Sequence, residues 1–137
     1  MPLTQNEDLK TILSETKTIA VVGWSNKANR PSNEVAAYLT SAGYSVYHVN
    51  PVIASTPEQP VYATLAEVPV PIDVVDVFRR SEDVPDVVEA AIRVGANVVW
   101  MQEGITNDAA AQRAEDAGLK VVQDRCMKIT HRKLMGS

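Results

Sequence analysis

Cationic and hydroxyl side chains lie in two short stretches of the sequence, each directly after an apolar run. They are Ser25, Lys27, Arg30, Ser32, Arg79 and Arg80. Guanidinium and ammonium groups bind phosphate through charge-assisted hydrogen bonds, and hydroxyl groups add further donors. If the two stretches meet in the folded chain, these residue types predict a site for an anionic ligand with more than one phosphate.

The first stretch follows a pattern typical of a strand that leads into a ligand-binding turn. Residues 19–22 are apolar without alternation, as expected of a strand covered on both faces. Gly23 allows backbone angles that a side chain forbids, and Pro31 and Ser32 are start signals for a helix, with Ser32 as a possible cap. Open α/β sheets bind phosphates where such a strand end meets a helix N-terminus.

The remaining elements follow from apolar periodicity and turn residues. We expect a helix over residues 4–15 with a capping box from Thr4 to Glu7, and helices capped by Ser81 and Thr106. Glycines end the helices near 43, 95 and 118. Further strands are expected at 44–50, 61–62, 73–78, 97–101 and 119–123, with a single helical turn at 64–68 and a tail of uncertain structure over 125–137.

This alternation predicts one α/β domain over residues 1–137, with a core over about 17–124. Its sheet is doubly wound, Rossmann-like and mainly parallel, with about five to six strands. In the common order the winding reverses between the strands at 19–22 and 73–78, which opens a crevice. The loops beginning at Gly23, Asn50, Arg79 and Gln102 then border that crevice.

Composition excludes several classes of protein. The chain has 137 residues, 45% of them hydrophobic, and a net charge of -4, which argues against a broad basic surface for nucleic acid. The single cysteine, Cys126, excludes an internal disulfide and fits a reducing compartment. Because no apolar run reaches membrane-spanning length and no signal peptide is visible, we expect a cytoplasmic protein without membrane contact.

Two common nucleotide motifs are absent. Gly23 is not followed by the G-x-G-x-x-G fingerprint, and the second main strand ends in Asn50-Pro51 in place of the acidic residue that holds an NAD ribose. No G-x-x-x-x-G-K-[ST] loop occurs in the chain. NAD and ATP are therefore disfavoured, and another nucleotide-like ligand is left.

Several blocks, in order, make the chain resemble the stand-alone CoA-binding proteins, whose domain is similar to the N-terminal domain of the succinyl-CoA synthetase alpha subunit. The resemblance covers residues 17–131. The blocks are VVG at 21–23, RPS at 30–32, VNP at 49–51, DVFRRS at 76–81, VWMQEGI at 99–105 and DRCMK at 124–128.

This resemblance implies a CoA site at the carboxyl ends of the strands. A lysine often follows the Asn-Pro pair in the family, and this chain has Val52 there, so Lys27 or Arg30 is expected to replace that phosphate contact. The expected contact residues are Gly23, Trp24, Ser25, Lys27, Arg30, Pro31, Ser32, Asn50, Pro51, Phe78, Arg79, Arg80, Met101, Gln102, Glu103 and Gly104.

Several residues that could contact the ligand or react with it also have a purely structural interpretation. Trp100 is expected in the core, and Phe78 is the better candidate to face the ligand. Arg79 and Arg80 either meet a phosphate or form a solvated strand end. Cys126 is interpreted as a half-buried structural cysteine and not as the partner of CoA in a mixed disulfide. His48 and His131 have no partner defined by sequence, so no catalytic residue and no metal ligand is assigned.

The resemblance implies a protein that binds CoA or an acyl-CoA through its phosphates without chemistry of its own. The synthetase alpha subunit needs a second domain with a phosphorylated histidine and an ATP-grasp partner, and neither is present here. The alternatives are a transferase or thioesterase that uses acyl-CoA and a redox regulator that binds NAD(P). A protein partner or a homo-oligomer stays open.

Overall fold

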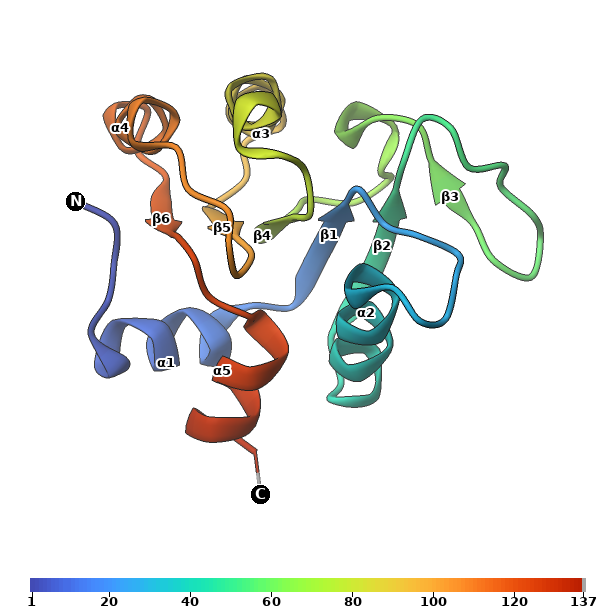
Figure 1. The fold of residues 1–137 in the computed structure, drawn as a ribbon, viewed down its shortest axis with the longest axis horizontal. Coiled ribbons are helices and arrows are strands. Elements are labelled where there is room, and N and C mark those ends of the chain that lie inside the picture. The colour runs from blue at the N-terminus through green and yellow to red at the C-terminus, as the bar shows by residue number, and fades with distance from the viewer. Residues whose placement is uncertain (137) are drawn as a thin grey trace.

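Six parallel strands form one sheet in a computed structural model that describes residues 1–136 (Figure 1). The strand order is β3-β2-β1-β4-β5-β6, so the winding reverses between β1 and β4 and the predicted doubly wound fold is confirmed. The strands are β1 (Thr18–Val22), β2 (Ser45–Val49), β3 (Val61–Tyr62), β4 (Val74–Val77), β5 (Val98–Met101) and β6 (Lys120–Val122).

Helices cover both faces of the sheet, with α1, α2 and α5 on one side and α3 and α4 on the other (Figure 1). The tail that the sequence left unassigned contains α5, whose Met127 and Thr130 are buried. Ser137, to which the sequence assigned no role, lies outside the described residues. The helices are α1 (Asn6–Glu15), α2 (Pro31–Ser41), α3 (Val84–Val94), α4 (Asp108–Asp116) and α5 (Met127–Leu134), with 3-10 turns η1 (Leu65–Glu67) and η2 (Ser81–Asp83).

The central strand β1 is buried on both faces, as its unbroken apolar run predicts. Ile19 and Val21 pack into the cluster under α1, α2 and α5, whereas Ala20 and Val22 pack into the cluster under α3 and α4. Trp100 on β5 is fully buried, and its indole Nε1 donates to the backbone oxygen of Arg125 at 2.9 Å. The prediction that Trp100 belongs to the core is confirmed.

The predicted helix caps at Thr4, Ser32, Ser81 and Thr106 are wrong. The N-cap positions are Gln5 for α1, Arg30 for α2, Asp83 for α3 and Asn107 for α4.

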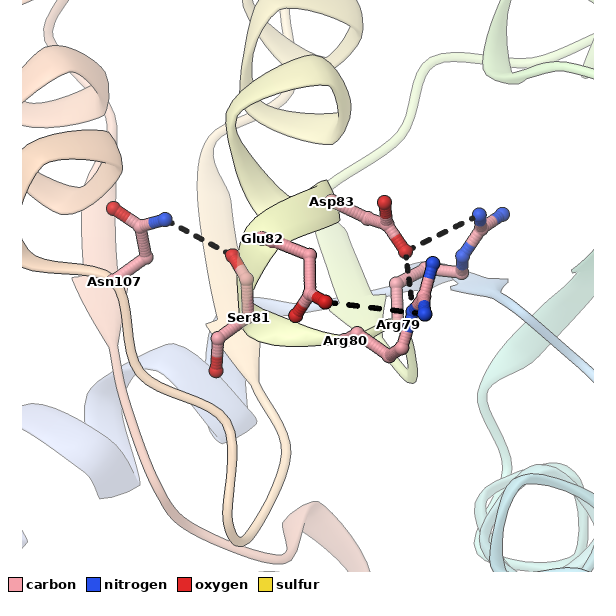
Figure 2. A network of polar contacts seen from close by, with 6 residues as sticks. All are labelled: Arg79, Arg80, Ser81, Glu82, Asp83 and Asn107. Carbon is pink, nitrogen blue, oxygen red and sulfur yellow. Dashed lines mark hydrogen bonds and ion pairs between the residues drawn. The ribbon is translucent and has the colours of Figure 1, made fainter.

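Tertiary contacts explain two of these differences. Ser81 lies in η2 before α3, and its hydroxyl oxygen accepts from the backbone N–H of Thr106 at 3.4 Å. Asn107 caps α4 through its side chain, which accepts from Ala110, and its amide nitrogen also donates to the carbonyl of Ser81 at 2.9 Å (Figure 2). An amide can do both at once and thereby displaces the neighbouring threonine as the cap.

Asp76 is the one buried side chain in the described residues whose oxygens both lack a hydrogen-bond partner. It pairs in register with Val21 on β1 and Trp100 on β5, both in the cluster under α1, α2 and α5. Burial raises the pKa of this carboxyl well above its usual range, because no partner compensates the loss of hydration. The folded protein therefore holds Asp76 in the protonated form at a pH where the unfolded chain is ionised.

We expect Asp76 to make the protein less stable as pH rises. Above the unfolded pKa of about 4, the unfolded state releases a proton that the folded state keeps, so the free energy of unfolding falls with pH up to the folded pKa. Asp76→Asn removes this linkage, and its stability advantage over the wild type should grow by up to about 1.4 kcal/mol per pH unit above pH 4. Urea unfolding at several pH values measures the difference.

Asp86→Asn, an exposed change on α3, is the matched control, because it also removes one carboxylate. The stability difference between Asp76→Asn and the wild type should grow with pH more steeply than that of Asp86→Asn. An equal pH dependence of the two variants would contradict a protonated Asp76 in the folded protein.

Candidate functional site

The turn after β1 is fixed by contacts with both neighbouring strands. The backbone N–H groups of Gly23 and Trp24 donate to the carbonyl of Val49 at 2.9 and 3.3 Å, and Phe78 N–H donates to Val22 at 2.8 Å. Gly23 has φ of +89°, and a Cβ there would collide with the carbonyl oxygen of Phe78. Only glycine fits this place, where the backbone after β1 passes the backbone after β4.

The loop between Gly23 and α2 is held by hydrogen bonds of its own. Ser32 Oγ accepts from Ser25 N–H at 3.0 Å, and Asn33 donates to the carbonyl of Ser25 at 2.9 Å. The Ser32 hydroxyl thus orders the loop instead of capping the helix. Lys27 and Arg30 are exposed, so their charged ends are accessible to a ligand.

Asn50 joins this turn to the end of β2. Its amide nitrogen donates to the carbonyl of Trp24 at 2.9 Å, and its amide oxygen accepts from Val52 N–H at 2.9 Å. The indole of Trp24 is 1% exposed and stacks on His48 with ring centroids 4.0 Å apart. Trp24 therefore offers a ligand no exposed side chain, and its N–H and carbonyl are both hydrogen-bonded, whereas Pro51 is exposed.

A cleft of about 570 Å³ opens next to this turn, between α2, the ends of β4 and β5, and α5. It contains six predicted contact residues, namely Pro31, Phe78, Arg79, Arg80, Gln102 and Glu103. Sequence reasoning did not assign its other lining residues to the site: Glu34, Val35, Ile105, Cys126, Lys128, Ile129 and Arg132. The other predicted residues lie outside the lining: Gly23, Trp24, Ser25, Lys27, Arg30, Ser32, Asn50, Pro51, Met101 and Gly104.

Four of the seven residues that sequence reasoning missed come from α5 or its N-cap Cys126, because the tail was not predicted to be a helix. Lys128 and Arg132 are four residues apart, which places them on one face of that helix. This spacing was the signal available in the sequence.

The two arginines after β4 contact carboxylates of the following turn (Figure 2). Arg79 lies 3.6 Å from Asp83, and Arg80 lies 3.3 Å from Asp83 and 3.8 Å from Glu82. The Arg80 side chain is 76% exposed, so water weakens these pairs. A phosphate could compete for either guanidinium at little cost.

The loop after β5 is anchored by the segment that leads into α5. Met101 is fully buried and its carbonyl accepts from Arg125 N–H at 3.3 Å, while Gln102 Oε1 accepts from Met127 N–H at 3.4 Å. Gly104, with φ of +86°, donates through its N–H to Asp124 at 2.6 Å. These contacts fix the edge of the cleft but engage groups that were predicted to meet the ligand.

Cys126 is half-buried, packs against the cluster under α1, α2 and α5, and also lines the cleft. Neither histidine forms a hydrogen bond with it among the described residues. His131 Nδ1 lies 2.8 Å from the Tyr38 hydroxyl, and burial lowers the pKa of His48, which stacks on Trp24. The described residues thus present no paired thiol and base.

Among the described residues, no group of three or more His, Cys, Asp or Glu side chains could hold a metal ion. Within residues 1–136, no helix is both long and apolar enough to cross a membrane.

Comparison with known proteins points to one family. A family model described as a CoA binding domain matches residues 17–132. The uncharacterized protein YneT of Bacillus subtilis is 40% identical over 124 residues, which is 90% of this chain and 92% of that protein.

Solved structures agree. A hypothetical protein from Pyrococcus horikoshii has a TM-score of 0.93 and 39% identity, covering 99% of this chain and 97% of that one. Cell-free ID.343 from Thermus thermophilus has a TM-score of 0.91 and 32% identity, covering 96% and 100%.

We expect Gly23→Ala to destabilise the protein by about 2–4 kcal/mol, because it adds a backbone collision to the cost of a positive φ. Gly118→Ala is the matched control, since Gly118 has φ of +93° and no atom within 4 Å of the added Cβ. It should cost only about 1 kcal/mol. Equal losses in urea unfolding would show that the approach of Gly23 to Phe78 carries no extra constraint.

Proposed function

The chain belongs to the CoA-binding domain family, and we propose that it binds coenzyme A or an acyl-CoA through its phosphates without catalysing a reaction. The observation that carries this proposal is the glycine turn at the switch point of the sheet, with a cleft directly beside it. Doubly wound sheets bind nucleotide phosphates at this place.

The diphosphate is proposed to lie against the turn from Gly23 to the start of α2. Pro31 occupies the first turn of α2, so the positive end of that helix faces the loop. Lys27 and Arg30 add exposed cations there. Val52, where the family often has lysine, is 86% exposed and offers no charge, which leaves this role to the two loop cations.

The cleft is proposed to take one arm of the ligand. Phe78 and Ile105 give it an apolar surface, while Arg79, Arg80 and the cations of α5 give it positive charge. Such a mixture suits a long ligand that has apolar stretches between polar groups.

A role without catalysis is favoured over an acyl-CoA transferase or thioesterase. A route through a covalent acyl-enzyme needs an activated nucleophile, and no hydrogen bond among the described residues joins Cys126 to a histidine. The NAD(P)-binding alternative is disfavoured because β2 ends in Asn50, whose amide is occupied by backbone partners.

Calorimetry of the purified protein tests the ligand directly. We expect a saturable signal with CoA or acetyl-CoA and none with NAD or NADP at equal concentration. Acetyl-CoA incubated with the protein should be recovered intact at the rate of the buffer control. Binding of NAD(P) alone, or accelerated loss of the thioester, would contradict the proposal.

Arg30→Ala should weaken CoA binding about tenfold while the fold stays intact, because it removes one charge-assisted contact to phosphate. The helix start needs only the backbone carbonyl of Arg30, which accepts from Asn33 and Glu34 and is kept in the variant. Arg93→Ala, an exposed change on α3 across the sheet, is the control and should bind as the wild type does. Unchanged affinity in Arg30→Ala would remove this side chain from the site.

A further inference from the structure

The far wall of the cleft is formed by one face of α5. Lys128, Ile129 and Arg132 line the cleft from this helix, opposite Pro31 and Glu34 at the start of α2. Lys128 and Arg132 are four residues apart, so both cations project from adjacent turns of the same face. The cleft therefore has a positively charged wall on α5, and Gly23 is not part of its lining.

These two cations have no acidic partner among the described residues. The ion pairs there leave both side chains out, whereas Arg79 and Arg80 each contact Asp83. Glu34 and Glu103 also line the cleft but do not come within the 4 Å of an ion pair with either cation. Lys128 and Arg132 are thus the cations of the cleft that an anion can approach without displacing a carboxylate.

The α5 wall is held in place by contacts of the helix with the core and with α2. Met127 and Thr130 are buried, and His131 Nδ1 lies 2.8 Å from the Tyr38 hydroxyl of α2. The Lys128 ammonium lies 5.9 Å from the centre of the Tyr38 ring, an additional contact with α2. The amino end of α5 also borders the cleft and adds the positive end of the helix dipole.

We propose that Lys128 and Arg132 form a second anion subsite, which binds an anionic group at the end of the arm that enters the cleft. The inference rests on the proposed CoA binding. With the diphosphate at the glycine turn, two chemical sources of such an anion are left: the 3′-phosphate of the ribose, or the distal carboxylate of a dicarboxylic acyl group. A phosphate or carboxylate there pairs with both cations in a partly desolvated cleft.

The test compares four ligands by calorimetry: CoA, dephospho-CoA, acetyl-CoA and succinyl-CoA. The variant is Lys128→Met combined with Arg132→Gln, which keeps most of each aliphatic stem and removes both charges. Lys133→Met is the control, since Lys133 is exposed on the same helix and does not line the cleft. Thermal unfolding of each variant checks that α5 stays in place.

The ligands form two pairs, CoA with dephospho-CoA and succinyl-CoA with acetyl-CoA. In one of these pairs the wild type is expected to bind the ligand with the additional anionic group about tenfold more tightly, and the double variant is expected to lose that preference. Loss of the preference for CoA over dephospho-CoA assigns the subsite to the 3′-phosphate. Loss of the preference for succinyl-CoA over acetyl-CoA assigns it to an acyl carboxylate. In both cases Lys133→Met should behave as the wild type.

Three results overturn the subsite. The first is a wild type without either preference, and the second is a double variant that keeps the preferences. The third is an equal loss for all four ligands, which would place the two cations near the diphosphate or in the fold. In each of these three results the wild type still binds CoA, so the proposed function stands. A wild type that binds none of the four ligands refutes the proposed function and the subsite together.

Discussion

The close approach of the backbone at Gly23 to the backbone at Phe78 is the constraint on which the rest of the site depends. It occurs at the ends of the neighbouring strands β1 and β4, where the sheet reverses its winding. The positive φ of Gly23 turns the chain toward α2, and the carbonyl of Phe78 leaves no room for a side chain. The glycine turn and the cleft are neighbours because these two strand ends meet.

The two parts of the site differ in how they are held. Around the turn, backbone and amide hydrogen bonds join Gly23, Ser25 and Asn50 to their surroundings, so the groups are fixed before any ligand arrives. In the cleft, the walls are fixed by the packing of α2 and α5, while the charged ends are exposed to water. The turn is held rigidly, whereas the charged side chains of the cleft are exposed to solvent. This difference suits a ligand in which the group at the turn is always the same and the group in the cleft varies.

The buried carboxyl of Asp76 is a local exception in a well-packed strand. Its neighbours in register, Val21 and Trp100, are apolar, so nothing in the described residues compensates the loss of hydration. Asp76 lies on β4 two residues before Phe78, and its side chain is on the face of the sheet covered by α1, α2 and α5. Because Asp76 stays protonated in the folded protein, the free energy of unfolding falls as pH rises. No hydrogen bond among the described residues offsets this loss.

The sequence alone determined the sheet, because its apolar runs and glycines are local signals. It placed the strand that ends at Val22, the turn at Gly23 and the edge strand at 61–62. It wrongly placed caps at Ser32, Ser81 and Thr106, since each of these residues or its neighbour has a hydrogen-bond partner that only folding brings near. It could not place α5, whose periodicity is short and whose packing against Tyr38 joins residues 93 positions apart. The tertiary structure therefore decided which cations share the cleft, because that depends on how α2 and α5 pack against each other on one face of the sheet.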